Sequence, residues 1–213
     1  MKSYVITIMD NEDSRMVAER CIRYSSWYNV NIKNWPATTP KDDLDKLYAD
    51  EGLSMDGLNE VYSRTANCAA AFFSHYSLWK KCVEDNETFA IFEHDAVLNN
   101  KIPEAHFDYV MNLGHPSYGK WNTPSTLGVN PLTSKRYFPG AHAYMVKPEG
   151  AKKLIEQAKI CARPTDVFMN LDDMPWLQEY YPWPAMAKDE FTTIQKQAGT
   201  TAKHNKVKII NAV

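Results

Sequence analysis

The sequence predicts an α/β fold built on a mostly parallel central sheet with helices on its faces. Short apolar runs rich in β-branched residues alternate with segments of helical periodicity, which is the order typical of such a sheet. The composition, with 44% hydrophobic and 23% charged residues, is that of an ordinary globular protein. A chain of 213 residues is close to the usual size of one domain, about 100 to 200 residues.

The first part of the chain is predicted to form a strand, a turn, a helix and a second strand. Residues 3–9 (SYVITIM) are an apolar, β-rich run, and the polar residues 10–13 (DNED) follow them. Apolar side chains recur three or four positions apart in residues 14–28, which indicates an amphipathic helix. The next strand is expected in residues 30–37 (VNIKNWPA), where Pro36 ends it.

The middle of the chain carries the clearest helical pattern. Residues 40–63 are rich in acids, and we expect a surface excursion with short helices. Residues 66–85 place large apolar side chains three or four apart, which predicts a well-buried helix. The apolar strand FAIF (residues 89–92) follows, and we expect it to continue without a break through EHDAVL (residues 93–98).

Two more strands and one helix are predicted in the second half of the chain. Strands are expected in residues 107–114 and, interrupted at a Pro-Gly pair, in residues 136–146. Residues 115–134 are a long loop rich in Pro, Gly, Ser, Thr and Asn, and such a loop is typically functional or disordered. Pro148 suits the first position of a helix, and the remainder is expected to be irregular and aromatic.

Charge and cysteine content exclude several classes of protein. A net charge of −2 gives no overall field for nucleic acid or anionic membrane. No apolar run approaches the ~20 residues that cross a bilayer, and the first residues of the sequence lack the basic region and following apolar core that a signal peptide would have. The four cysteines lack metal-ligand spacing, and there is no P-loop or dinucleotide-binding glycine pattern. We therefore expect a soluble, reduced, cytoplasmic protein.

The sharpest local feature is a pair of acids at a strand end. Glu93 and Asp95 follow four apolar residues and are two apart, so they project to the same side if the strand continues. Two carboxylates in this arrangement suit Mg²⁺ or Mn²⁺, which bridge carboxylates to substrate phosphates. The alternative is that the acids begin a solvated turn.

Four segments together resemble glycosyltransferase family 25, in order and in rough spacing, across about residues 3–170. The segments are YVITIMDNEDSRMVAER, SHYSLWKKCVEDNETFAIFEHDAVL, GAHAYMVKPEGAKKLIEQA and PTDVFM. They correspond to the family's first strand with its following Arg, its Ser-His helix with the acidic strand end, its Gly-x-x-x-Tyr strand and its Pro-x-Asp. The centre of the acidic motif is His94 here, where the family usually has Asp.

The resemblance implies a GT-A type domain over residues 1–190, a nucleotide-sugar donor that is often UDP-linked, and inversion at the anomeric carbon. It implies Mn²⁺ or Mg²⁺ on Asp95 with Glu93. The expected donor-binding residues are Arg15, Ser74, His75, Glu93 and His142, of which His142 rests on its place after Gly140, a residue that permits close approach of a ligand or of backbone. A packed, hydrogen-bonded role is an equal alternative for His75.

An inverting transfer needs a base near the acceptor hydroxyl. Asp166 matches the acid of the family's Pro-x-Asp segment and is our candidate; its alternative is a helix cap. Its rivals are Asp172, Asp173 and Glu179.

Residues 191–213 form a basic tail without acids, expected to be either part of the donor site or partly disordered. Its lysines suit a diphosphate or a nucleic-acid backbone, and the plain alternative is a solvated end. The aromatic residues of WLQEYYPWP suit core packing or stacking on a sugar.

The sequence therefore predicts a metal-dependent inverting glycosyltransferase whose acceptor is a hydroxyl of a glycan, a protein or a modified nucleic-acid base. The alternatives are a non-catalytic binding module of the same fold and a metal-dependent nucleotidyltransferase.

Overall fold

The computed structural model describes residues 1–59, 63–117, 119–188, 191–196 and 208–209. Within these ranges, no helix is long and apolar enough to cross a membrane.

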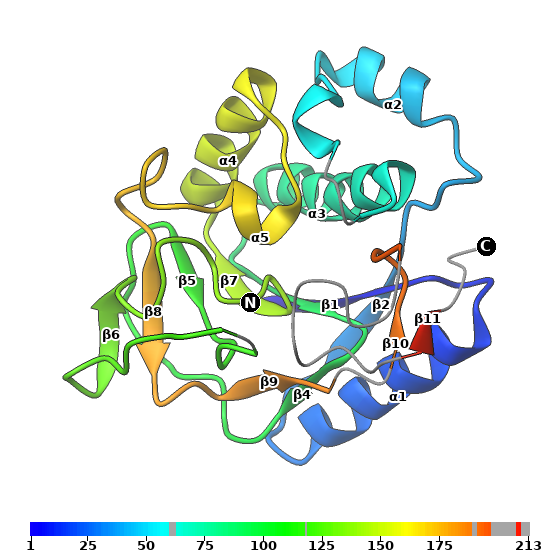
Figure 1. The fold of residues 1–213 in the computed structure, drawn as a ribbon. Coiled ribbons are helices and arrows are strands. Elements are labelled where there is room, and N and C mark those ends of the chain that lie inside the picture. Colours follow the sequence, from blue (N-terminus) through cyan, green and yellow to red (C-terminus); the bar gives the residue numbers. More distant parts are fainter. Residues whose placement is uncertain (60–62, 118, 189–190, 197–207, 210–213) are drawn as a thin grey trace.

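A mixed seven-stranded sheet forms the centre of the molecule (Figure 1). Across the sheet, the strands lie in the order β2 (Ile32–Pro36), β1 (Lys2–Thr7), β3 (Phe89–Glu93), β7 (Ala143–Val146), β5 (Val110–Asn112), β8 (Gln178–Tyr181) and β6 (Gly128–Pro131). Strands β2, β1 and β3 are parallel to one another, as are β5 and β8, whereas β7 and β6 run antiparallel to their neighbours. The predicted α/β class is confirmed.

Helices cover both faces of the sheet. They are α1 (Glu12–Ser26), α2 (Leu44–Glu51), the short 3₁₀ helix η1 (Asp56–Leu58), α3 (Thr65–Asp85), α4 (Pro148–Ile160) and α5 (Thr165–Phe168). Figure 1 shows α3 and α4 packed together on one face, with α1 on the other. Each of the three long helices lies where the sequence periodicity predicts it, and Pro148 is the first residue of α4 as expected.

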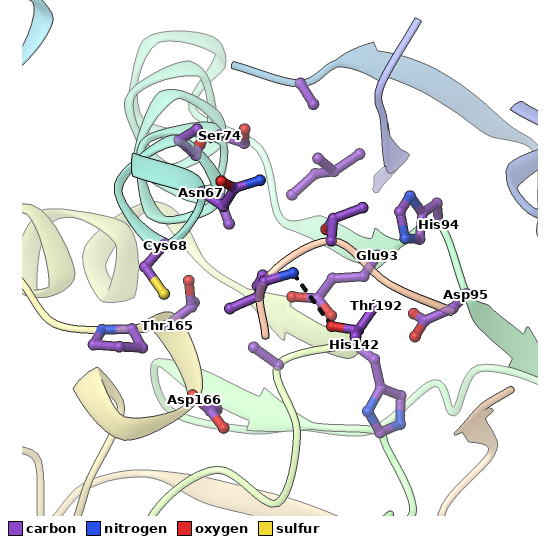
Figure 2. A pocket seen from close by; sticks show the side chains of 18 of the residues that line it. Asn67, Cys68, Ser74, Glu93, His94, Asp95, His142, Thr165, Asp166 and Thr192 are labelled. Atoms are coloured by element: carbon purple, nitrogen blue, oxygen red, sulfur yellow. Dashed lines mark hydrogen bonds between the residues drawn. The ribbon is translucent and has the colours of Figure 1, made fainter. Parts of the chain in front are cut away.

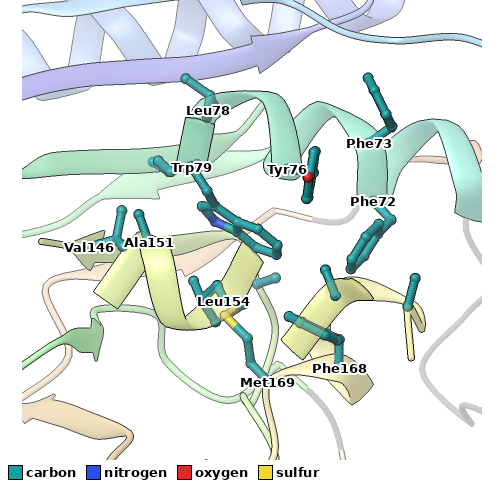
Figure 3. Close-up of a cluster of buried hydrophobic side chains, with 14 of the residues drawn as sticks. Phe72, Phe73, Tyr76, Leu78, Trp79, Val146, Ala151, Leu154, Phe168 and Met169 are labelled. Carbon is teal, nitrogen blue, oxygen red and sulfur yellow. The ribbon is translucent and has the colours of Figure 1, made fainter. Parts of the chain in front are cut away.

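The longest helix, α3, is the centre of the larger hydrophobic cluster (Figure 3). Trp79 stacks on Phe168 of α5 with ring centroids 5.6 Å apart, and Phe72 meets the same ring edge-on at 5.1 Å. All three side chains are almost completely buried, and aromatic contacts of this kind add about 0.5–1.5 kcal/mol each beyond the burial of area. This packing fixes α5 against α3, although α5 itself is a single turn.

Parallel pairing brings the carboxyl ends of three strands to one edge of the sheet. Ile6 of β1 lies opposite Glu93 of β3, and Thr7 lies opposite Pro36 of β2. Ligands of α/β proteins commonly bind outside such an edge. The polar turn after β1 leads directly into α1, because the side chain of Asn11 accepts a hydrogen bond from the Ser14 amide and caps the helix.

One expectation for the acidic segment was wrong. The strand does not continue from Glu93, because His94 and Asp95 form a turn. The chain then leaves the central sheet, and β4 (Ala96–Leu98) pairs antiparallel with β9 (Ala185–Ala187). The turn is held by the carbonyl of Asp95, which accepts a hydrogen bond from the Lys188 amide 3.0 Å away.

The region after α4 is more regular than the sequence suggests. It supplies β8 to the central sheet, β9, and β10 (Phe191–Thr192), which pairs with β11 (Lys208–Ile209). The long loop of residues 115–134 likewise contains β6. Each of these strands has four residues or fewer, so no periodicity extends far enough to reveal them.

The start of α4 is pressed against the chain before β5, which makes Gly150 a sensitive position. A Cβ atom there would lie 2.3 Å from the carbonyl oxygen of Tyr109. We expect Gly150→Ala to destabilise the fold by about 1–2 kcal/mol, because overpacking against backbone outweighs the gain of about 0.5–1 kcal/mol in helix propensity. Urea unfolding would measure it, with the exposed Lys152→Ala on the same helix as the control. A stabilised Gly150→Ala variant would contradict this packing.

Candidate functional site

A pocket of about 340 Å³ opens at the carboxyl ends of β1 and β3 (Figure 2). Its walls come from the first half of α3, the segment after β2, the turn after β3, residues 140–142, the start of α5 and residues 191–195. This volume is in the range of small-molecule sites, about 300–1,000 Å³.

The pocket brings together six of the seven residues that the sequence singled out. They are Ser74, His75, Glu93, Asp95, His142 and Asp166. Arg15 does not line it, because its guanidinium lies outside and donates to the carbonyl of Met9. The structure therefore does not bring Arg15 together with the other predicted donor-binding residues.

Ser74 holds one wall in place. Its hydroxyl donates to the carbonyl of Ala70 at 2.8 Å and accepts a hydrogen bond from the Thr38 amide at 2.9 Å. Both bonds are made by a fully buried side chain. Ser74 therefore ties the segment after β2 to α3 and shapes the pocket wall.

Glu93 is held by a buried histidine. The Nε2 atom of His75 lies 3.2 Å from Oε1 of Glu93, and the other ring nitrogen, Nδ1, lies 2.9 Å from the hydroxyl of Tyr144. That hydroxyl also accepts a hydrogen bond from the indole of Trp79 at 2.8 Å. Burial by itself raises the pKa of Glu93, but the hydrogen bond from His75 opposes burial, and the pKa of Glu93 lies below its usual range.

His94 is anchored to the start of α1. The Ser14 hydroxyl accepts a hydrogen bond from the Ile8 amide at 3.0 Å and shares a second one with Nδ1 of His94, 2.7 Å away. Burial lowers the pKa of His94 to about 4, against the opposing effect of Glu93. A neutral ring, packed edge-on against Phe191, stands where the family motif has a carboxylate. It joins the turn after β3 to α1 and to the last wall of the pocket.

His142 fits between two glycines. A Cβ atom on Gly114 would lie 2.4 Å from its ring, and one on Gly140 would lie 2.6 Å from it. Gly140 therefore makes room for the neighbouring histidine ring, where a ligand or backbone was expected to approach, and it also lines the pocket. Burial lowers the pKa of His142 to about 4, and Nε2 has no hydrogen-bond partner among the described residues.

Asp166 lies on the pocket wall opposite the sheet edge. It is the second residue of α5, after the N-cap residue Pro164, and Oδ1 accepts the Val167 amide at 2.9 Å. Its negative charge also acts on Lys135, because it raises the pKa of that lysine against the larger lowering effect of burial.

The three rival acids are engaged elsewhere and do not line the pocket. Glu179 accepts hydrogen bonds from the amides of Thr133 and Ser134 and from the indole of Trp183, so this buried carboxylate organises the loop before β7. Asp172 forms a bidentate pair with Arg136.

Asp173 accepts from Asn170 at 3.0 Å and lies near Arg163. Among the four acids considered for the base, Asp166 is the one on the pocket wall.

The last wall of the pocket is the start of the tail that the sequence offered as part of the donor site, but the contact that holds it there was not predicted. Arg64, the N-cap residue of α3, donates its backbone amide to the carbonyl of Ile194 at 2.8 Å and its guanidinium to the carbonyl of Thr193. Residues 191–195 thus cross the pocket beside α3 and line it. Nothing local in the sequence marks this contact, because the two segments are more than a hundred residues apart. The other predicted parts of the tail, residues 197–207 and 210–213, lie outside the described residues.

The chemistry of the acids fits a hard divalent cation. Asp95 and Glu93 both line the pocket and offer only oxygen ligands. In the described part of the chain, no three or more His, Cys, Asp or Glu side chains are arranged to enclose a metal ion. A cation here would need further ligands from a substrate, as Mg²⁺ does when it binds through one or two carboxylates and substrate phosphates.

The comparisons with known proteins identify one family, and the similar solved structures are distant. The family model of glycosyltransferase family 25, described as an LPS biosynthesis protein, matches residues 2–120, more than half of the chain. No curated protein matches.

One similar structure is a glycosyltransferase involved in the glycosylation of the major capsid of PBCV-1, at 10% identity and a TM-score of 0.33; the match covers 73% of this chain and 66% of that one, just under two thirds. Another is CTP:phosphocholine cytidylyltransferase from Streptococcus pneumoniae, at 10% identity and a TM-score of 0.39, with 88% and 92% covered.

The buried His142 predicts a pH dependence of stability. The unfolded chain binds a proton as the pH falls through 6.5, whereas the folded chain does so only near pH 4, so the free energy of unfolding falls in this window and is constant above it. We expect His142 to contribute about 3 kcal/mol to this fall. Urea unfolding of His142→Asn between pH 7 and pH 4 should show a shallower decline. The exposed His106→Asn is the matched control, and equal slopes for both variants would contradict the assignment.

Proposed function

Because the chain belongs to glycosyltransferase family 25, we propose that the pocket at the ends of β1 and β3 binds a nucleotide-sugar donor, UDP-linked, and transfers its sugar to an acceptor hydroxyl with inversion. Family membership makes the chain a member of the transferase class of enzymes, as the sequence predicted. The observation that carries the proposal is the presence of Asp95 with Glu93 and of Asp166 on different walls of one pocket (Figure 2).

The donor diphosphate is placed beside Asp95 and Glu93. Two carboxylates repel a diphosphate unless a cation lies between them, so Mn²⁺ or Mg²⁺ held by Asp95 and Glu93 is part of the proposal. A bound divalent cation would stabilise negative charge on the leaving diphosphate. The neutral state of His94 supports this arrangement, since a charged imidazole in that place would compete for the same carboxylates.

The acceptor enters beside Asp166. The acceptor's hydroxyl oxygen attacks the anomeric carbon from the side opposite the diphosphate. The new bond to that oxygen forms as the bond between the anomeric carbon and the phosphate oxygen breaks. The bonding pair leaves with the diphosphate, and the hydroxyl proton passes to the Asp166 carboxylate. The position of Asp166 at the start of α5, held through Phe168 to the core of α3, supports a base fixed in space.

The proposal leaves the acceptor as a hydroxyl of a glycan, a protein or a modified nucleic-acid base. A panel of sugar nucleotides, with Mn²⁺ and with or without acceptors, tests the activity through release of nucleoside diphosphate. A binding module would bind a sugar nucleotide and release nothing, and a nucleotidyltransferase would release pyrophosphate from a nucleoside triphosphate. Either result would replace the proposed function.

Asp95→Asn is expected to lower transfer at least ~100-fold, because it removes a charged ligand that acts on the leaving diphosphate. The measurement is the initial rate at saturating donor with Mn²⁺, and EDTA should abolish the wild-type rate. The control is Asp108→Asn, which changes an exposed acid two residues before β5. Full activity in EDTA would refute the metal requirement.

Asp166→Asn is expected to keep donor binding and lose transfer, because a base acts on the acceptor proton only in the transition state. Donor affinity by calorimetry and single-turnover transfer would be measured on the same protein. Asp172→Asn, whose acid pairs with Arg136 outside the pocket, should transfer at the wild-type rate. Wild-type transfer by Asp166→Asn would remove this residue from the mechanism.

A further inference from the structure

Four side chains form a continuous hydrogen-bonded chain from the core of the protein to the pocket: Trp79, Tyr144, His75 and Glu93. The fold places them as two pairs, one pair on α3 and the other on the neighbouring strands β7 and β3. His75 and Trp79 are four residues apart on α3 and face the same side of the helix. Tyr144 of β7 lies opposite Ile91 of β3, and Glu93 is two residues further along that strand, on the same face.

The chemistry of the groups gives this chain a direction. An indole nitrogen can only donate, so the Tyr144 oxygen accepts from Trp79, and its one hydrogen is left for the other neighbour, Nδ1 of His75. Nδ1 therefore acts as an acceptor and carries no hydrogen. The hydrogen of the ring is then on Nε2, which donates to Oε1 of Glu93.

The opposite arrangement is unfavourable at both ends. A hydrogen on Nδ1 would place two donors on the Tyr144 oxygen and leave its buried hydroxyl hydrogen without an acceptor among the described residues, which is costly in the interior. It would also turn the lone pair of Nε2 toward the Glu93 carboxylate, 3.2 Å away. Neither penalty arises when Nδ1 accepts from Tyr144 and Nε2 donates to Glu93.

The first three groups are in the dry core. Trp79 and Tyr144 are fully buried and His75 is 1% exposed, whereas 36% of the Glu93 side chain is exposed. The low local dielectric strengthens such hydrogen bonds. The rings of Phe72 and Phe168 pack against the Trp79 indole and restrict its rotation. These hydrogen bonds thus fix the orientation of the Glu93 carboxylate through Oε1 and leave Oε2 for the pocket.

We propose that Tyr144 and Trp79 are positioning residues for the donor site: they hold His75 with its hydrogen on Nε2, and His75 in turn orients the Glu93 carboxylate toward the donor phosphates and their cation. This inference rests on the proposed function for its consequence, but the arrangement of the hydrogen atoms stands independently of it. Partners that orient a ligand in this way commonly change metal affinity or activity 10–100-fold when removed.

The hydrogen positions are read directly from nitrogen-15 chemical shifts of the histidine side chains at neutral pH, with the His75 signals assigned by their loss in His75→Gln. The wild-type protein should show a protonated Nε2 and an unprotonated Nδ1 on His75. In Tyr144→Phe this single arrangement should give way to a mixture or to the other tautomer. The matched control is Tyr48→Phe, which removes the buried hydroxyl of a tyrosine on α2; this hydroxyl donates to the carbonyl of Ala69 on α3. It should preserve the wild-type signals.

The functional arm measures binding of Mn²⁺ with UDP by calorimetry. Tyr144→Phe should weaken it about 10–100-fold, and Tyr48→Phe should leave it unchanged. A hydrogen on Nδ1 of His75 in the wild-type protein would overturn the proposal without any variant. A changed tautomer with unchanged binding would overturn the positioning role. Absence of Mn²⁺ and UDP binding in the wild-type protein, with the predicted tautomer present, would instead reject the proposed function and with it the positioning role, leaving the hydrogen arrangement intact.

Discussion

A carboxylate at the end of a buried strand is the constraint around which this site is arranged. Glu93 ends β3, the strand between β1 and β7 in the centre of the sheet, and an ion in such a place is tolerated only when other groups bond to it. His75 supplies the bond, Tyr144 and Trp79 determine which nitrogen supplies it, and each comes from an element that packs on β3 or its neighbour. The polar site and the apolar core are therefore one structure, because Trp79 belongs to both.

The same core determines where the second acid lies. Trp79 and Phe72 hold Phe168, and Phe168 ends the single turn of α5 that carries Asp166. A four-residue helix has little stability of its own, so its orientation depends on this packing. The distance between the two sides of the pocket is thus set by α3, a rigid 21-residue helix, more than by the loops that surround the opening.

Sequence periodicity predicts much of the fold. The resemblance of the sequence to one family predicts most of the site residues that the pocket brings together. The helices around Cys21, Trp79 and Leu154 are visible because each has a broad apolar face. Local patterns cannot reveal the turn at His94, since its cause is the pairing of β4 with β9, nearly a hundred residues away. The strands β6 and β8 have only four residues each, so local patterns do not reveal them either.

The unpredicted parts of the site are those made by tertiary contacts. Tyr144 stands in a strand of ordinary apolar pattern, and only its position beside α3 gives it a role. Gly140 was expected to admit a ligand or backbone, whereas the space of its missing side chain is filled by the ring of His142. The contact that holds residues 191–195 in the pocket wall comes from Arg64, more than a hundred residues earlier in the chain. The metal, the donor and the base remain proposals built on this geometry.

The most direct measurement of the central claim is a crystal structure of the protein soaked with UDP and Mn²⁺, with the metal located by its anomalous scattering. The account predicts a manganese peak bound to Asp95 and Glu93 and a diphosphate in the pocket between α3 and residues 191–195. A nucleotide bound outside this pocket, or a manganese ion away from both carboxylates, would contradict it.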